Sequence, residues 1–204
     1  MTPFFNKAFI LETTAPLLIN MTEHQCFENI AFNASEADDE YHNCTFIGCD
    51  FSNRTILNTV FEKCTFRTCN LALSKWKNAL REVTFTDCKL TGVDLTEISK
   101  FSGDLTFVNS LLDYCNLTGT KLRRSRFSDC QIYEGYFDEA DLSLSVFERC
   151  NLERSSFFKA NLEKADFSSA FNFSINPDTC RIKKTIFSEY GLRGLVAHLD
   201  IEIK

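Results

Sequence analysis

Ten cysteines and three histidines are the residues of this 204-residue chain with the widest chemical repertoire. Thiolate and imidazole groups bind zinc, and a thiolate beside an imidazole can act as a nucleophile. The cysteines recur as C-x4-C at positions 44/49 and 64/69, whereas zinc sites use closer C-x2-C pairs. His24, His42 and His198 are isolated in the sequence, and it contains no glycine-rich phosphate loop and no G-x-S-x-G motif. We therefore expect no enzyme activity, no metal site and no cofactor.

The positions of the cysteines indicate a structural role. In a secreted chain, ten cysteines would suggest a disulfide framework. Nine of them, however, share one recurring position, two residues before an apolar residue: Cys44, Cys49, Cys64, Cys69, Cys88, Cys115, Cys130, Cys150 and Cys180. A free cysteine in a buried position behaves as a small apolar residue. We interpret these nine as buried thiols, and Cys26 has no place in the pattern.

The pattern is a five-residue repeat, which is clearest between Ser110 and Ser169. Its centres are all apolar: Leu112, Leu117, Leu122, Phe127, Ile132, Phe137, Leu142, Phe147, Leu152, Phe157, Leu162 and Phe167. The residues two before the centres are all small: Ser110, Cys115, Thr120, Ser125, Cys130, Gly135, Ala140, Ser145, Cys150, Ser155, Ala160 and Ala165. Neither the 3.6-residue period of a helix nor the two-residue period of a strand returns a side chain to the core at every fifth position.

A backbone that buries two of every five side chains and then turns can close into a four-sided tube. Four repeats complete one coil, so residues twenty apart stack at the strand spacing of about 4.8 Å. Each coil buries its apolar side chains only by stacking on its neighbours. The segments 140–144 (ADLSL), 160–164 (ANLEK) and 165–169 (ADFSS) resemble the pentapeptide-repeat family. The resemblance implies an all-β fold, the right-handed quadrilateral β-helix.

The chain divides into three segments. Residues 1–25 lack the repeat and are interpreted as an N-terminal cap, and residues 26–187 form the predicted β-helix. Within it, the acidic stretch 33–42 is predicted to project as a loop, and the repeat slips frame near 72–84 and near 96–111. This threading predicts that one side of the tube carries a column of small residues: Cys49, Cys69, Cys88, Ser110, Cys130 and Cys150.

Residues 188–204 are predicted to form a short helix and a tail, with Ser188 as the helix N-cap. Apolar residues recur there with helical spacing, and such a short helix needs a partner for its apolar stripe. We expect part of the stripe to cover the end of the tube and the rest to meet a second copy by two-fold symmetry. The candidate dimer-interface residues are Phe187, Leu192, Leu195, Val196 and Leu199.

The formal net charge of −6 argues against direct binding of nucleic acid through a basic surface. The sequence has no apolar run long enough for a membrane span and no evident signal peptide, so we expect a cytoplasmic protein without membrane contact. Sorted by predicted side, the acidic residues are spread over two neighbouring sides. The basic residues collect on the side whose centres are Leu122, Leu142, Leu162 and Ile182.

The segments 69–74, 88–94, 174–177 and 199–203 resemble one bacterial subgroup of the family, which includes Qnr-type quinolone-resistance proteins and the albicidin and microcin immunity proteins. The resemblance implies a rod-shaped homodimer that mimics DNA, binds DNA gyrase or topoisomerase IV and protects the enzyme from poisons. The alternative is a structural or interaction rod with a different protein partner. The candidate partner-binding residues are Asp38, Asp39, Glu40, Asp94, Glu97, Asp113, Glu134, Asp138, Glu139 and Glu153.

Overall fold

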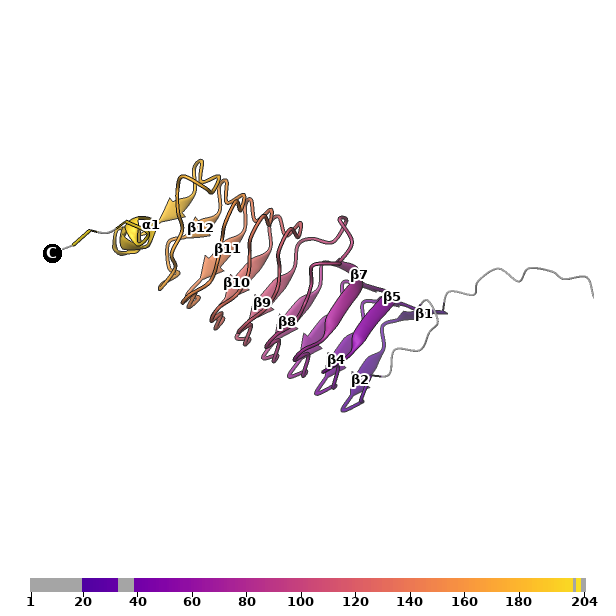
Figure 1. The fold of residues 1–204 in the computed structure, drawn as a ribbon. Helices are drawn as coiled ribbons and strands as arrows, with labels where there is room; N and C mark the ends of the chain where they lie inside the picture. Colours follow the sequence, from indigo (N-terminus) through magenta and orange to yellow (C-terminus); the bar gives the residue numbers. More distant parts are fainter. Residues whose placement is uncertain (1–19, 33–38, 200, 203–204) are drawn as a thin grey trace, which may run out of the picture.

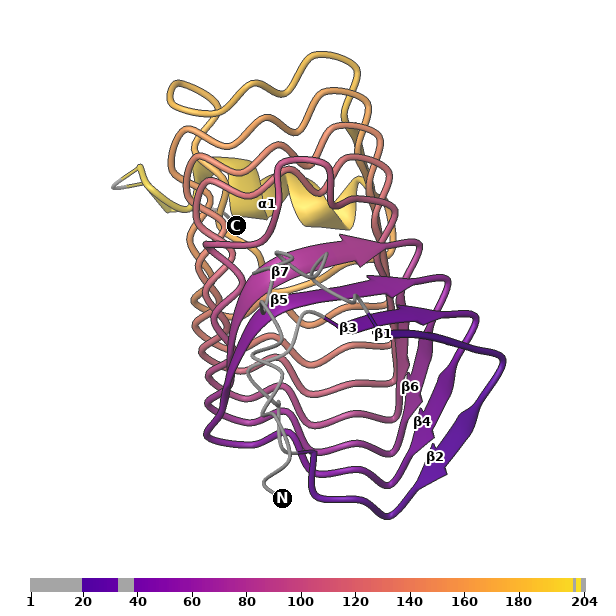
Figure 2. The same cartoon turned by 90° about the vertical axis from the view of Figure 1, so that its right-hand side faces the viewer.

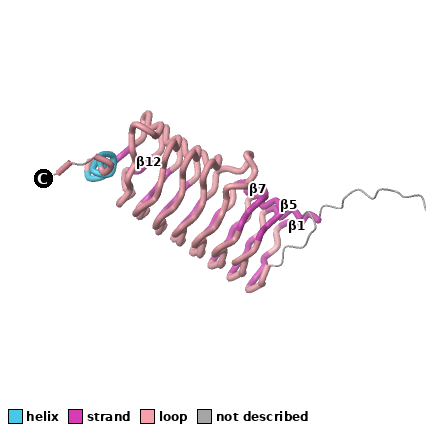
Figure 3. The backbone as a smooth tube through the Cα atoms, viewed as in Figure 1, coloured by secondary structure: helices cyan, strands magenta, loops and turns pink. Residues whose placement is uncertain are grey.

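The chain forms a parallel β-solenoid whose coils stack along one axis (Figure 1). The structure is a computed structural model, and it describes residues 20–32, 39–199 and 201–202. Seen after a quarter turn, the coils outline a four-sided tube (Figure 2). Most of the backbone lies in turns and loops, and the strands are short (Figure 3). The predicted fold class, a β-helix with a short C-terminal helix, is confirmed. The described residues contain no helix that is long and apolar enough to cross a lipid bilayer.

Within the described residues, thirteen strands form two parallel sheets. The longer sheet runs the length of the rod and contains β2 (Cys26–Glu28), β4 (Thr45–Ile47), β6 (Thr65–Arg67), β8 (Thr84–Thr86), β9 (Thr106–Val108), β10 (Arg126–Ser128), β11 (Val146–Glu148), β12 (Asp166–Phe167) and β13 (Ile186–Phe187). The shorter sheet contains β1 (Asn20–Glu23), β3 (Asp39–His42), β5 (Thr55–Glu62) and β7 (Lys75–Arg81). It strengthens only the N-terminal part of the tube.

A column of phenylalanines fills the tube behind the longer sheet. Its members are Phe27, Phe46, Phe66, Phe85, Phe107, Phe127, Phe147, Phe167 and Phe187. Neighbouring rings stack with centroid separations between 4.5 and 5.7 Å. The spacing of parallel strands, about 4.8 Å, sets this ring separation. Rings from the adjacent sides meet the column edge-on, as Phe137 meets Phe147 at 5.9 Å. The repeat centres therefore form one continuous aromatic core.

Both predicted frame slips are present, and the column of small residues runs through them. Backbone hydrogen bonds to the carbonyl oxygens of the column members join successive coils. Asn70 N donates to Cys49 O and Lys89 N donates to Cys69 O, both at 3.0 Å, and farther along the rod Asn151 N donates to Cys130 O at 3.1 Å. The first slip is a β-bulge, because two residues of β5 between Leu57 and Val60 lie opposite one residue of β7. The second slip adds residues to the 96–102 connection, where the Phe101 side chain is 84% exposed.

Two predicted boundaries differ from the structure. Asp39–His42 is strand β3 and does not project, although the rest of the predicted loop, residues 33–38, lies outside the described residues. The ring of Tyr41 stacks on Phe61 at 5.3 Å, which places Tyr41 at a repeat centre. Asn20–Glu23, within the predicted cap, is strand β1 and pairs with β3. The tube therefore begins at least six residues before the predicted start at residue 26.

The corners of the tube depend on left-handed backbone conformations. The residue two after a centre has a positive φ at most corners, for example 61° at Arg154 and 64° at Leu144. This conformation costs a non-glycine residue roughly 1–2 kcal/mol. The hydrogen-bond ladder between coils offsets that cost, because Arg124 N donates to Ser143 O and Leu144 N donates to Glu163 O, both at 3.0 Å.

A short helix covers the C-terminal end of the tube. It consists of the 3-10 turn η1 (Tyr190–Leu192) and α1 (Arg193–Val196). The Ser188 hydroxyl accepts the Gly191 N–H at 3.0 Å, although the N-cap residue of η1 is Glu189, one position after the predicted Ser188. A Cβ atom at Gly194 would collide with the Phe173 carbonyl oxygen. Glycine is therefore required for the helix to approach the last coil this closely.

Candidate functional site

The interior of the tube holds side chains that pack and do not react. Nine cysteines are buried and Cys26 is exposed on β2. Burial raises the pKa of the Cys64 and Cys115 thiols to about 12, so neither forms a thiolate at neutral pH. Within the described residues, no group of histidines, cysteines and carboxylates could hold a metal ion. The surfaces of the rod are the remaining candidates for function.

Thiol labelling checks this description of the interior. In the native protein we expect only Cys26 to react quickly with a thiol reagent at mildly alkaline pH. The nine buried cysteines should react at the rate of unfolding, because the thiolate is the reactive form and the tube excludes the reagent. Cys26→Ser should abolish the fast phase and leave the slow phases unchanged. Fast labelling of several thiols in native Cys26→Ser protein would contradict the buried column.

Four faces of the rod carry the outward side chains, and we name them by what they contain. The phenylalanine face lies over the longer sheet. The cysteine face follows the bridged positions Asp50, Asn70, Lys89, Leu111, Gln131, Asn151 and Phe171. The tryptophan face follows Lys75, Asp94, Asn116, Tyr136 and Ser156. The basic face follows Lys121, Asp141, Asn161 and Arg181.

The cysteine face carries three of the predicted acidic residues. The half-buried Asp113 accepts the Tyr133 N–H at 2.9 Å, and Glu134 forms an ion pair with Arg154 at 2.8 Å. The exposed Glu153 carboxylate has neither a hydrogen bond nor an ion pair with any described residue. Glu153 is therefore the predicted residue on this face whose charge is most open to a partner.

On the tryptophan face, local contacts engage all four predicted carboxylates. Glu97 pairs with Lys77 at 2.8 Å, and Glu139 lies 4.0 Å from the Lys159 ammonium group. Asp94 accepts the Thr96 N–H at 3.0 Å. Asp138 accepts hydrogen bonds from the Ser156 hydroxyl and the Phe158 N–H. The two ion pairs offset part of the negative charge of the face, and both Glu97 and Glu139 remain exposed to solvent.

The predicted N-terminal acidic residues are only partly placed. Glu40 lies on β3, with its carboxylate 3.2 Å from Nε2 of His42. Asp39 begins the same strand, and Asp38 lies outside the described residues. The structure therefore does not group Asp39 and Glu40 with the predicted acidic residues between positions 94 and 153.

The phenylalanine face has a cluster of ion pairs that the sequence analysis missed, in which Asp129 and Glu148 meet Arg126 and Arg149. Arg149 binds Asp129 through two hydrogen bonds of 2.6 and 2.7 Å and also contacts Glu148. The guanidinium group holds the pKa of the Asp129 carboxyl below its usual range. This ion pair could have been predicted from the sequence, because residues 129 and 149 are twenty positions apart and residues with that spacing are neighbours on successive coils.

The basic face confirms the predicted sorting of charge. Its cations are Lys100, Lys121, Arg123, Arg124, Lys164, Arg181, Lys183 and Lys184, against Asp104, Asp141 and Glu163. Of these, Arg181 pairs with Glu163 at 2.8 Å. Cations thus outnumber carboxylates on the C-terminal half of this face, whereas on the other three faces carboxylates outnumber cations among the described residues.

The C-terminal end exposes apolar side chains. Leu192 and Leu199 are half exposed, and Tyr190, which the sequence analysis did not select, is 92% exposed. Leu195 and Phe187 are partly buried and pack against the core. The structure therefore divides the predicted interface residues into those that cover the tube and those that remain available to a partner.

Comparison with known proteins gives one family match. Residues 79–157 match the profile described as "Pentapeptide repeat region". No curated protein matches the chain.

Similar solved structures include two trypsin-treated variants of QnrB1, a plasmid-mediated fluoroquinolone resistance protein. Both are 17% identical to this chain, and the matches cover 91% of it. They cover 100% and 99% of the two QnrB1 chains, with TM-scores of 0.48 and 0.49. HetL, a pentapeptide repeat protein involved in heterocyst differentiation regulation from the cyanobacterium Nostoc sp. strain PCC 7120, is 14% identical over 83% of this chain and 87% of its own, with a TM-score of 0.40. At these identities and TM-scores, the matches carry no information on the function of this chain.

Proposed function

We propose that this chain, which carries a pentapeptide repeat region, is a binding protein that mimics DNA toward DNA gyrase or topoisomerase IV and protects the enzyme from poisons. The observation that carries the proposal is the excess of carboxylates on three faces of a straight rod, within a chain of formal net charge −6. A DNA-binding surface is basic, so an acidic rod is electrostatically complementary to it.

The dimensions of the rod fit the same proposal. Nine stacked strands at a spacing of about 4.8 Å give a rod of about 38 Å, close to one helical turn of duplex DNA. A dimer joined at the C-terminal end would span about twice that length. Leu192, Leu199 and Tyr190 supply exposed apolar surface at this end.

A supercoiling assay tests the proposal. Purified gyrase, its poison and relaxed plasmid are titrated with this protein, and topoisomerase IV is assayed in parallel by decatenation. We expect the protein to restore activity in the presence of the poison and to inhibit the enzyme at higher concentration without it, because a DNA mimic competes with substrate. No effect of either kind on either enzyme would overturn the proposal.

Charge reversal locates the acidic surface in that assay. Glu139→Lys combined with Glu153→Lys changes two exposed carboxylates on adjacent faces. Glu28→Lys combined with Glu82→Lys changes the net charge equally at the N-terminal part of the rod. We expect the first variant to lose protection and the second to retain it. Equal loss in both variants would mean that only the total charge matters.

A second candidate function is that of an interaction rod for another protein. It is favoured by the local ion pairs of Glu97, Glu134 and Glu139, which weaken the acidic field of the rod. Normal folding of this protein with no effect in either topoisomerase assay would support this candidate.

A further inference from the structure

The coils part at one place on the basic face. On the coils of this face nearer the C-terminus, backbone hydrogen bonds of 2.8–2.9 Å join each coil to the next. Leu142 N donates to Asn161 O, and Leu162 N donates to Arg181 O. Among the described residues, no backbone hydrogen bond joins residues 100–104 to residues 121–124. The separation lies at the second frame slip, where the bridge between Arg81 and Gly103 places Ser102 opposite the repeat centre Leu80. Its hydroxyl accepts the Leu80 N–H from the coil on the other side at 3.0 Å.

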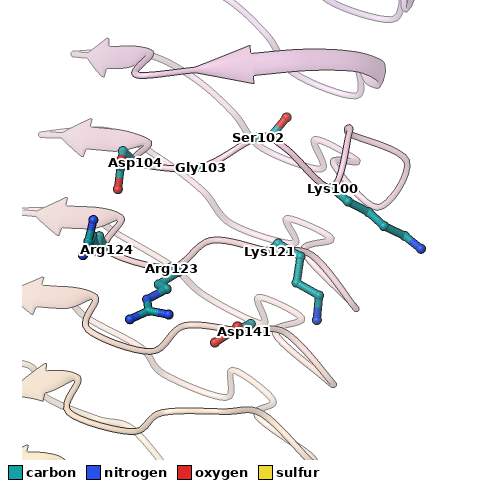
Figure 4. Close-up of a pocket in the computed structure, with 8 residues that line it drawn as sticks. All are labelled: Lys100, Ser102, Gly103, Asp104, Lys121, Arg123, Arg124 and Asp141. Carbon is teal, nitrogen blue, oxygen red and sulfur yellow. The ribbon is translucent and has the colours of Figure 1, made fainter.

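The separation forms a polar cleft of about 450 Å³ (Figure 4). Its lining residues are Lys100, Ser102, Gly103, Asp104, Lys121, Arg123, Arg124 and Asp141. Residues 102–104 form one edge in Figure 4, and Lys121, Arg123 and Arg124 lie along the other. Four cationic side chains thus share the cleft with two carboxylates, and all four are exposed.

The backbone adds an unpaired donor to the cleft. On the coils below, the N–H groups equivalent to that of Lys121 donate across the coil boundary, from Asp141 to Thr120 O at 2.9 Å and from Arg181 to Ala160 O at 3.0 Å. The Lys121 N–H therefore points into the separation, and it has no hydrogen-bond partner among the described residues. A free N–H group beside guanidinium and ammonium groups is a favourable environment for an anion.

The two carboxylates reduce the positive charge of the cleft without cancelling it. Burial alone would raise the pKa of the Asp141 carboxyl, but hydrogen bonds from Ser143 and Asn161 and the charge of Lys121 lower it. The Asp141 carboxyl is thus ionised, and its Oδ1 accepts a hydrogen bond from Asn161 Nδ2 at 2.9 Å. Asp104 forms no ion pair with any described residue.

We propose that this cleft and the cations below it bind the phosphate groups of a nucleic-acid backbone. The second group of cations, Lys164, Arg181, Lys183 and Lys184, lies up to three coils beyond Lys121, or about 14 Å along the rod. Over that distance, duplex DNA presents about eight phosphate charges. Arginine forks match phosphate geometry, and the lining residues include no apolar side chain that a protein partner could bury.

The proposal stands apart from the function proposed above, because it requires no topoisomerase. It also revises the expectation drawn from the net charge. The total of −6 averages over the whole chain and hides one strongly basic half-face. Binding of phosphates depends on the local field within a Debye length, roughly 10 Å at moderate salt.

Fluorescence anisotropy with a labelled DNA duplex tests the proposal on the full-length protein. We expect a dissociation constant in the micromolar range at about 50 mM salt and, for four phosphate contacts, a slope of log K against log salt of about −3 to −4. Arg123→Glu combined with Arg124→Glu should weaken binding at least tenfold. Arg67→Glu combined with Lys89→Glu, exposed cations on other faces with no described ion pair, changes the net charge equally and should have little effect.

Three outcomes would overturn the proposal. The first is no binding by the wild-type protein at low salt, and the second is equal weakening in the two variants, both shown by circular dichroism to be folded. The third is displacement of the labelled duplex by a simpler anion as effectively as by unlabelled duplex. That anion is either inorganic phosphate at matched phosphate concentration or poly-glutamate at matched charge. The phosphate result would leave a site for a single phosphate, and the poly-glutamate result would leave a surface for an acidic protein.

Discussion

Replacing Phe147 with alanine is expected to lower the free energy of unfolding by about 3–5 kcal/mol. Phe147 is fully buried, and its ring stacks between Phe127 at 4.6 Å and Phe167 at 4.5 Å. The coils above and below are fixed by ladder hydrogen bonds, so they cannot close the resulting cavity. Urea denaturation, followed by circular dichroism, measures the change.

Phe147→Leu is the matched control. Leucine occupies the centre position on other faces of the tube, as at Leu142 and Leu152, so we expect a loss well below that of alanine, about 1 kcal/mol. If the alanine variant unfolds at the same urea concentration as the wild type, the continuous aromatic column is not what stabilises the rod.

Replacing Leu192 with aspartate is expected to convert the proposed dimer to a monomer, with a dissociation constant raised at least a hundredfold. Leu192 is 50% exposed beside Tyr190, and a carboxylate buried there by a partner would be unpaired. Leu195 is a poorer choice for this test, because it packs against the core and its replacement would also uncover the end of the tube. Sedimentation velocity over a range of protein concentrations measures the change.

Leu111→Asp is the control for the dimer. Leu111 is 46% exposed but lies on the cysteine face, far along the rod from the C-terminal helix. We expect this variant to remain dimeric. A wild-type protein that is monomeric at tens of micromolar would rule out the C-terminal dimer, and dissociation of both variants alike would place the interface elsewhere.

The repeat made most of the fold predictable. An apolar residue at every fifth position and a small residue two before it define the tube, and the cysteine column then fixes the register through both frame slips. The pentapeptide repeat match confirms the resemblance on residues 79–157. The strand β3 was missed because Tyr41 follows Asp39, so the small-residue rule fails there although the tyrosine ring fits a centre.

The surfaces were less predictable than the core. The sequence sorts charges by face, because the repeat fixes which way each residue points. It does not show which carboxylates are already paired, and the contacts of Glu97, Glu134 and Asp138 depend on side-chain conformation. The open seam beside Lys121 was also invisible, since the frame slip shows that residues are added but not where the ladder opens.

Competition between this protein and DNA for a type II topoisomerase tests the central claim most directly. The Arg123→Glu, Arg124→Glu variant is used, so that DNA held by the rod itself does not contribute to the signal. Labelled protein is bound to gyrase or topoisomerase IV and titrated with duplex DNA, and the bound fraction is followed by anisotropy. DNA mimicry predicts that the duplex displaces the protein completely and that excess protein displaces the duplex. A stable complex of enzyme, duplex and protein together, or no binding to either enzyme, would contradict it.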